Sequence, residues 1–135
     1  MMNTYDLQLL ELAVRHSMGK STKYVNGLSR SIESYVHPPR DWKVVKEAGV
    51  ALFAPEKGGS YTVFETRPMD PRISSYCAQD VAQLFKLEEA LRRSLGLWGS
   101  NWENRVIAGS TKRVNQARSL VYEGQGKHRA LAPVI

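Results

Sequence analysis

The chain has 135 residues, 42% of them hydrophobic, which is enough for one ordinary folded domain. Its formal net charge of +6 favours an anionic partner, and nucleic acid is the commonest one. The single cysteine, Cys77, excludes an internal disulfide and fits a reducing, intracellular location in the cytoplasm or nucleus. The sequence shows no secretory leader and no apolar run of about 18 residues, so no membrane partner is expected.

The first half of the chain is predicted to be mainly helical. Residues 2–6 are predicted as a short strand, residues 7–16 as a helix and residues 17–22 as a loop. A second helix is predicted over residues 25–36, because two prolines follow it at positions 38 and 39. Asp41 is predicted to cap a third helix, which ends near Phe53, before Pro55.

The second half is predicted to hold two further helices. Residues 60–66 are β-branched and aromatic, a composition that favours an extended segment. A long helix is predicted over residues 71–95, because Asp70 is a favoured N-cap and Pro71 suits the first helical position. Asn101 is predicted to cap the last helix, which places on one face Trp102, Val106, Val114, Ala117 and Val121. Residues 124–135 are predicted as a tail.

Asp80 occupies an unusual place on the helix predicted over residues 71–95. At the helical period one apolar stripe contains Ile73, Cys77, Leu84, Leu87, Leu91 and Leu95. Asp80 falls inside this stripe, and Tyr76, one turn earlier, lies on its margin. An ionised carboxylate in apolar surroundings costs several kcal/mol unless a cation or hydrogen-bond donors meet it. A partner for Asp80 is therefore expected.

The residues around Asp80 resemble a motif of a known nuclease family. Arg67-Pro68-Met69, a short gap, and then Tyr76-x-x-x-Asp80-Val81 resemble the third motif of the RNase D-type (DEDDy) 3′–5′ exonucleases, members of the RNase H-like superfamily. Tyr5-Asp6-Leu7-Gln8-Leu9 resembles the segment that follows the family's second motif. Gly27-Leu28-Ser29 resembles its Gly-Leu helix opening, and residues 58–67 resemble the variant of fungal members. Tyr-x-x-x-Asp is common by chance, whereas the ordered set is more specific.

The resemblance implies metal-dependent phosphodiester hydrolysis of nucleic acid from the 3′ end. In the family, four carboxylates hold two Mg²⁺ or Mn²⁺ ions that clamp the attacking and leaving oxygens, and a tyrosine orients the attacking water. Tyr76 and Asp80 match the catalytic tyrosine and the last metal-binding carboxylate. The other three carboxylates are expected upstream, and no Asp-x-Glu occurs anywhere in this chain. Asp6 matches a position that serves strand-to-helix geometry rather than metal binding.

By this resemblance the chain is the C-terminal half of such a domain, over residues 1–123, followed by the tail. The expected fold is predominantly α, with about five helices and at most one or two short strands, as the C-terminal part of an RNase H-like α/β exonuclease fold. Helices that cover an absent sheet would expose apolar faces and favour self-association or association with an N-terminal half. The alternative is that the helices close on one another as a small bundle.

Four basic residues are candidates for nucleic-acid binding, namely Arg67, Arg72, Lys112 and Arg113. Other basic residues are dispersed, among them Lys46 and the run from Lys127 to Arg129. A solvated helix face is the favoured interpretation of each cluster, and an arginine before a proline, such as Arg67, often ties down a loop.

Three functional hypotheses remain open from the sequence. In the first, the chain is the C-terminal portion of a 3′–5′ exonuclease domain and is inactive alone, because three of four metal-binding carboxylates are absent. In the second, it is a non-catalytic remnant of that fold that binds nucleic acid or protein. In the third, it is an unrelated helical interaction module. The polymer expected in the first two is single-stranded RNA or DNA.

Overall fold

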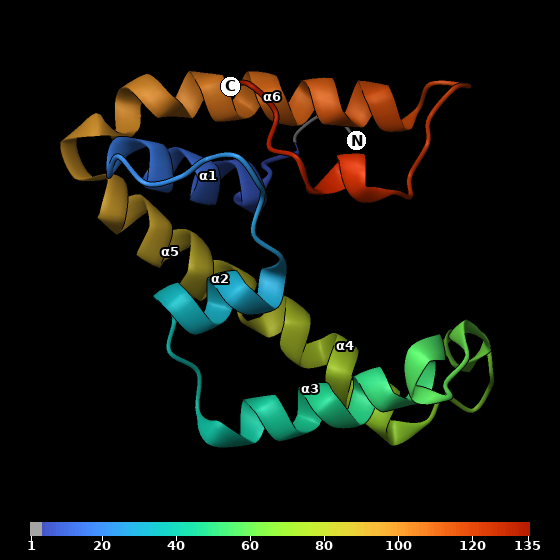
Figure 1. Cartoon of the computed structure of the whole chain (residues 1–135). Coiled ribbons are helices and arrows are strands. Elements are labelled where there is room, and N and C mark those ends of the chain that lie inside the picture. The colour runs from blue at the N-terminus through green and yellow to red at the C-terminus, as the bar shows by residue number, and fades with distance from the viewer. Residues whose placement is uncertain (1–3) are drawn as a thin grey trace. The chain divides into compact units, whose positions relative to one another are not determined.

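The computed structural model describes residues 4–135 and, of these, Trp98 and Gly99 by backbone alone. The described residues form six α-helices and four short 3-10 helices (Figure 1). They contain no strand, and their only β-type pairing is an isolated bridge between Tyr24 and Leu131. The prediction of a predominantly α protein is therefore confirmed.

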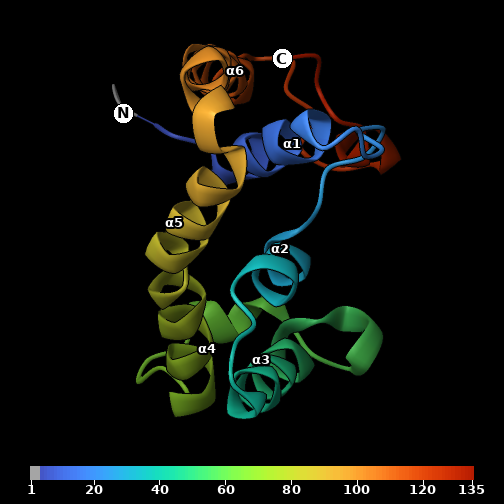
Figure 2. The same ribbon diagram turned by 90° about the vertical axis from the view of Figure 1, so that its left-hand side faces the viewer.

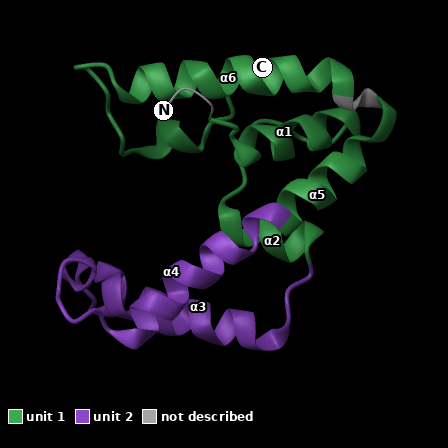
Figure 3. Cartoon of the chain, turned by 180° about the vertical axis from the view of Figure 1, so that it is seen from behind, with its two compact units in different colours: residues 1–36, 86–135 green, residues 37–85 purple. Residues whose placement is uncertain are grey.

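The chain divides into two compact units, which Figure 3 shows in separate colours. Unit 1 combines residues 1–36 with residues 86–135, and unit 2 consists of residues 37–85. The boundary falls two residues into α5, so the rest of that helix belongs to unit 1.

Unit 1 contains α1 (Leu7–Ser17), α2 (Leu28–Tyr35), α5 (Leu84–Leu95), α6 (Gly99–Ala117) and the 3-10 helices η3 (Gly96–Trp98) and η4 (Lys127–Ala130). Its α1 begins at Asp6, whose Oδ1 accepts a hydrogen bond from the Gln8 amide at 2.9 Å, as an N-cap does. Helix α1 packs against α6 (Figures 1 and 2). Gly109 permits the approach, since a Cβ there would lie 2.8 Å from Leu9 Cδ1.

The core of unit 1 is aliphatic and is drawn from both ends of its sequence. Helix α1 alone contributes five buried apolar side chains, and α5 contributes three leucines from the stripe predicted around Asp80. These buried residues are Leu9, Leu10, Leu12, Ala13, Val14, Leu87, Leu91 and Leu95. Trp102 and Val106 of α6 are also buried, as their predicted face requires.

Residues predicted as a tail are hydrogen-bonded to the segment between α1 and α2. The Val25 amide donates to Ala130 O at 2.9 Å, and the Ala132 amide donates to Lys23 O at 3.0 Å. These bonds flank the Tyr24–Leu131 bridge. The last residues of the chain are thereby held in unit 1, close to α6.

Glu11 is a fully buried carboxylate in α1, and four hydrogen bonds satisfy it. Arg15 donates through Nε at 2.8 Å and through Nη2 at 2.9 Å. The Asn26 side-chain amide donates at 2.8 Å, and the Tyr35 hydroxyl donates at 3.3 Å. A buried charge is tolerated only when it is paired and hydrogen-bonded in this way. Glu11 therefore ties α1 to α2 and to the segment that joins them.

The folded state favours the neutral form of two tyrosines of unit 1, which predicts a loss of stability at alkaline pH. Burial, followed by the Glu11 carboxylate, raises the pKa of Tyr35 from 10.0 to about 12. Burial, together with the hydrogen bond to Glu103, raises the pKa of Tyr5 to about 12. Since the folded-state pKa is the higher one, this contribution is fully present below pH 10 and is lost as the pH rises through 12.

We therefore expect the melting temperature to fall as the pH rises from 10 to 12. The absorbance of ionised tyrosine at 295 nm should appear at a higher pH in the folded protein than it does for an unperturbed tyrosine of pKa 10.0. Tyr35→Phe should flatten the part of this fall that Tyr35 causes. A fall of unchanged depth in the Tyr5→Phe/Tyr35→Phe double variant would contradict the assignment.

Unit 2 contains α3 (Arg40–Phe53), η1 (Pro55–Lys57), η2 (Tyr61–Phe64) and α4 (Pro71–Ala82). Helix α4 begins as predicted, with Asp70 Oδ1 accepting from the Arg72 amide at 2.8 Å and Pro71 at the first position. Helices α3 and α4 pack on each other at Gly49, where a Cβ would lie 2.5 Å from Tyr76 Cβ. The backbone of α3 therefore meets the Tyr76 side chain directly.

The prediction of an extended segment over residues 60–66 is wrong. Residues 61–64 form η2, and Ser60 caps it by accepting from the Thr62 amide at 3.3 Å. The aromatic rings of the segment pack on α3 instead, with ring centroids of Phe53 5.2 Å from Phe64 and 5.8 Å from Tyr61. β-propensity needs a neighbouring strand to pair with, and the described residues offer none here.

Other predicted boundaries also need correction. The helix predicted over residues 71–95 is two helices, α4 and α5, separated at Gln83, whose backbone angles remain right-handed helical (φ −86°, ψ −11°). The last helix begins at Gly99 rather than after Asn101, and it ends at Ala117, so Val121 lies beyond it and is exposed. Of the strand predicted over residues 2–6, residues 4–6 are not a strand and the rest lie outside the described residues.

Candidate functional site

Asp80 has the cationic partner that its position demands, and the partner is Lys46. Lys46 Nζ lies 2.9 Å from Asp80 Oδ1, across the contact between α3 and α4. The two side chains are only 16% and 20% exposed, so the pair is largely shielded from water. Charge-assisted hydrogen bonds of this kind are among the stronger ones in proteins. An ammonium group of the same chain thus meets the carboxylate.

Tyr76 lies beside this pair, on the same face of α4 as Asp80. Lys46 Nζ sits 5.0 Å from the centroid of the Tyr76 ring, which suits a cation–π contact. The Phe53 ring lies 5.4 Å away on the α3 side. Burial, followed by the charge of the Asp80 carboxylate, raises the pKa of the Tyr76 hydroxyl. The surroundings of Tyr76 therefore favour the neutral hydroxyl over the phenolate.

Two further residues bound the same contact. Gln79 Nε2 donates to the backbone oxygen of Trp42 at 2.9 Å, which joins the start of α3 to α4. The Trp42 ring is buried and lies 5.4 Å from Lys46 Nζ, while its Nε1 has no hydrogen-bond partner within the described part of the chain. Trp42 is therefore a core residue of unit 2.

The residues around Asp80 do not fit a two-metal centre by themselves. Two Mg²⁺ ions each need about six oxygen ligands, and several must come from carboxylates. Within residues 4–135, no group of three or more His, Cys, Asp or Glu side chains is placed to hold a metal ion. The carboxylate that is present already binds the Lys46 ammonium. Metal-dependent hydrolysis would require ligands from elsewhere.

The two predicted nucleic-acid contacts of unit 2 are engaged in local structure. Arg67 donates through Nη1 to the backbone oxygens of Phe64 at 3.0 Å and Thr66 at 2.9 Å, so it ties down the loop before α4. Arg72 pairs with the capping Asp70 at 2.7 Å, and this pair is exposed. The hydrogen bonds to Arg72 lower the pKa of Asp70. Both arginines are exposed, and Arg67 in addition holds the loop before α4 in place.

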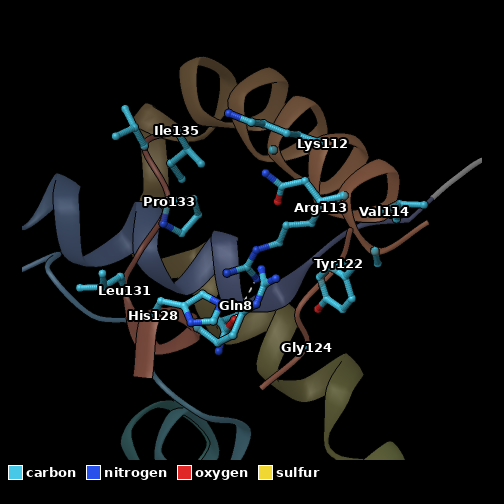
Figure 4. Close-up of a pocket in the computed structure, with 15 residues that line it drawn as sticks. Gln8, Lys112, Arg113, Val114, Tyr122, Gly124, His128, Leu131, Pro133 and Ile135 are labelled. Atoms are coloured by element: carbon cyan, nitrogen blue, oxygen red, sulfur yellow. Dashed lines mark hydrogen bonds between the residues drawn. The ribbon is translucent and has the colours of Figure 1, made fainter. Parts of the chain in front are cut away.

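The other two predicted contacts, Lys112 and Arg113, lie together in unit 1. They line a pocket of about 610 Å³ between α6 and the residues that follow it (Figure 4). Arg113 reaches from α6 toward Gln8 and donates to Gln8 Oε1 at 2.8 Å and to Asp6 Oδ2 at 2.7 Å. Lys112 is exposed. Arg113 thus has a structural partner, and Lys112 remains open to an anion.

Several residues of these sites were not predicted. Lys46 lies midway along a face of α3 that also carries Trp42, Gly49 and Phe53. A cation within an otherwise apolar helix face was therefore a signal in the sequence for the partner of Asp80. Tyr122, His128 and Arg129 join the unit 1 pocket through the return of residues 118–135. Local sequence patterns carry no signal for such a return.

Comparison with protein families, with curated proteins and with solved structures finds no match in any of the three. Among the helices that the structure describes, none has the length and apolar character needed to span a lipid bilayer.

Proposed function

We propose that this chain is the C-terminal portion of an RNase D-type 3′–5′ exonuclease domain, which binds single-stranded nucleic acid and does not cut it on its own. The observation that carries the proposal is the arrangement of Tyr76 and Asp80. They share one face of α4, in the order and spacing of the family motif, while Lys46 holds the one carboxylate that could serve a metal ion. The fold that this proposal implies is part of an RNase H-like domain, acting with an N-terminal half.

The charge distribution supports nucleic acid as the partner. The chain carries a formal net charge of +6, and each unit has an exposed cation, Lys112 in unit 1 and Arg72 in unit 2. Neutralising phosphates with such side chains gives binding that depends on salt and little on base sequence. Proposed substrates are therefore single strands of RNA or DNA in the cytoplasm or nucleus, with Mg²⁺ or Mn²⁺ needed only by a completed domain.

The test is an incubation of the chain with a 5′-labelled single strand in the presence of Mg²⁺. We expect the strand to be bound at low salt, to be released as salt rises, and to remain at full length. Shortening from the 3′ end that depends on Mg²⁺ and disappears in Asp80→Asn would contradict the inactive assignment. Absence of binding at any salt concentration would contradict the assignment of the partner.

A second candidate, a protein-binding remnant of the same fold, is favoured by exposed apolar side chains of unit 2. Val44, Val81 and Phe85 are 66%, 61% and 81% exposed. Exposed apolar groups of this kind mark surfaces that a partner covers. Sedimentation of the wild type as a dimer, and of Val81→Ser/Phe85→Ser as a monomer, would favour this candidate over the first.

A further inference from the structure

The pocket of unit 1 has the size and composition of a site for a small anionic ligand. Its volume of about 610 Å³ falls within the range of about 300–1,000 Å³ that is typical of ligand sites. Figure 4 shows the segment after α6 folding back so that His128 and Pro133 lie across the pocket from Lys112, while Tyr122 lies on the side of Val114. The site is thus formed by three separate stretches of one unit.

The pocket is basic, and its charge is only partly compensated. Four of its lining residues are Lys112, Arg113, His128 and Arg129, and none is Asp or Glu. Asp6, outside the lining, pairs with Arg113. Within the described residues, no ion pair engages Lys112 or Arg129. Two cations therefore line one cavity without an Asp or Glu partner, which favours an anion there.

An aromatic ring stands beside these cations. The Arg129 guanidinium carbon lies 4.3 Å from the centroid of the Tyr122 ring, and Tyr122 is 44% exposed. Arg129 also donates through Nε to the backbone oxygen of Glu123, which fixes the guanidinium over the ring. Aromatic side chains with a neighbouring arginine form stacking platforms for flat heterocycles.

Glycines shape the segment that carries Tyr122 and His128. Gly126 has a φ of +116°, which L side chains rarely adopt, and a Cβ there would lie 2.8 Å from His128 Nδ1. A Cβ on Gly124 would lie 3.2 Å from Tyr122 Cε1. The turn that brings both rings to the pocket therefore depends on glycine at position 126.

We propose that this pocket binds a nucleotide, with Lys112 and Arg129 on the phosphate and Tyr122 against the base. The two possible sources are a free nucleoside monophosphate and the phosphorylated terminal nucleotide of a single strand. The polymer source rests on the proposed function, whereas binding of the free nucleotide does not. The pocket belongs to unit 1, whereas the Tyr76–Asp80 face belongs to unit 2.

The experiment is calorimetry and NMR titration of the full chain with adenosine monophosphate, adenosine, inorganic phosphate, a 5′-phosphorylated single strand and a glutamate-rich peptide. The variant is Lys112→Ala/Arg129→Ala, and its matched control is Lys43→Ala/Lys57→Ala, which removes the same charge from exposed positions of unit 2. Tyr122→Leu tests the ring separately. Circular dichroism verifies that each variant is folded.

We expect adenosine monophosphate to shift the resonances of Tyr122 and His128 and to bind more tightly than adenosine or phosphate alone. The affinity of the double variant should fall by about tenfold or more, because the loss of one charge-assisted hydrogen bond already corresponds to about tenfold in affinity. The affinity of the control variant should not change. Binding of the strand but not of the free nucleotide, with the same loss in the variant, assigns the site to a polymer end and supports the pocket.

Three results would overturn the inference. One is equal affinity for the glutamate-rich peptide, since a ring would then be irrelevant. Another is unchanged affinity for every probe in Lys112→Ala/Arg129→Ala. If the double variant still binds the strand, the proposed function is retained and only the assignment of binding to this pocket is rejected. The third is the absence of any binding by adenosine monophosphate and by the strand, which rejects both.

Discussion

Glu11→Ala is expected to destabilise unit 1 by about 3–5 kcal/mol, the cost of breaking a buried ion pair by removing one partner. The Glu11 side chain is fully buried and accepts hydrogen bonds from Arg15, Asn26 and Tyr35. Its removal leaves the Arg15 guanidinium, which is only 12% exposed, without its counter-ion, although that group keeps the backbone oxygens of Ser21 and Tyr24 as acceptors. The Asn26 amide and the Tyr35 hydroxyl lose the Glu11 acceptor. Since domains are stable by only about 5–15 kcal/mol, this loss is a large share of the total.

Urea unfolding and hydrogen exchange of the α1 amides measure this effect. The matched control is Glu89→Ala, because Glu89 and Arg93 form an i,i+4 pair of the same kind that is 72% and 75% exposed. Apart from the difference in helix propensity between glutamate and alanine, Glu89→Ala should lower the free energy of unfolding by no more than about 0.5 kcal/mol. Glu11→Gln retains one acceptor oxygen, so its loss of free energy of unfolding should lie between those of Glu11→Ala and Glu89→Ala. An effect of Glu11→Ala as small as that of the control would show that Glu11 is not the anchor of α1.

Gly49→Ala is expected to destabilise unit 2, although helix propensity alone predicts the opposite. Alanine is favoured over glycine within a helix by about 1 kcal/mol. A Cβ at position 49 would, however, lie 2.5 Å from Tyr76 Cβ, 2.6 Å from Cγ and 2.8 Å from Cδ2. These atoms belong to the root of a side chain that cannot swing away, so α3 and α4 must separate. Overpacking of this kind costs about 1–3 kcal/mol, and Gly49→Val should cost more.

Hydrogen exchange in α3 and α4 reports this loss within unit 2. Ala51→Gly is the calibrating control, because Ala51 is exposed on the same helix and its replacement isolates propensity. If Gly49→Ala instead stabilised α3 by as much as Ala51→Gly destabilises it, the close contact with Tyr76 would not exist in solution.

Local signals in the sequence predicted the features that depend on local physics. Asp70 and Pro71 start α4 as expected, because caps act within one helical turn. The caps predicted at Asp41 and Asn101 are wrong, since these residues lie inside α3 and α6. The leucines at positions 87, 91 and 95 are buried, since their spacing follows the helical period.

Features that depend on partners distant in sequence were missed. Residues 61–64 form a 3-10 helix because their rings pack on Phe53, a contact that propensity does not contain. The cation that meets Asp80 is Lys46, thirty-four residues away. Its place in the apolar stripe of α3 marks it as a candidate, but spacing within one helix does not show which residue of another helix it meets. The pocket of unit 1 joins Gln8 to residues of the last quarter of the chain, so it arises only when the chain folds back.

The central claim is that Asp80 provides no metal site in this chain, because its carboxylate pairs with Lys46 and no metal-binding group is placed among the described residues. The direct measurement is an NMR titration with Mn²⁺, whose paramagnetism broadens resonances near a bound ion. We predict no saturable broadening centred on Tyr76 and Asp80, and none in Lys46→Met, because the other carboxylates of a metal centre are missing from the described residues. Saturable broadening at Tyr76 and Asp80 in the wild type, lost in Asp80→Asn, would contradict the account.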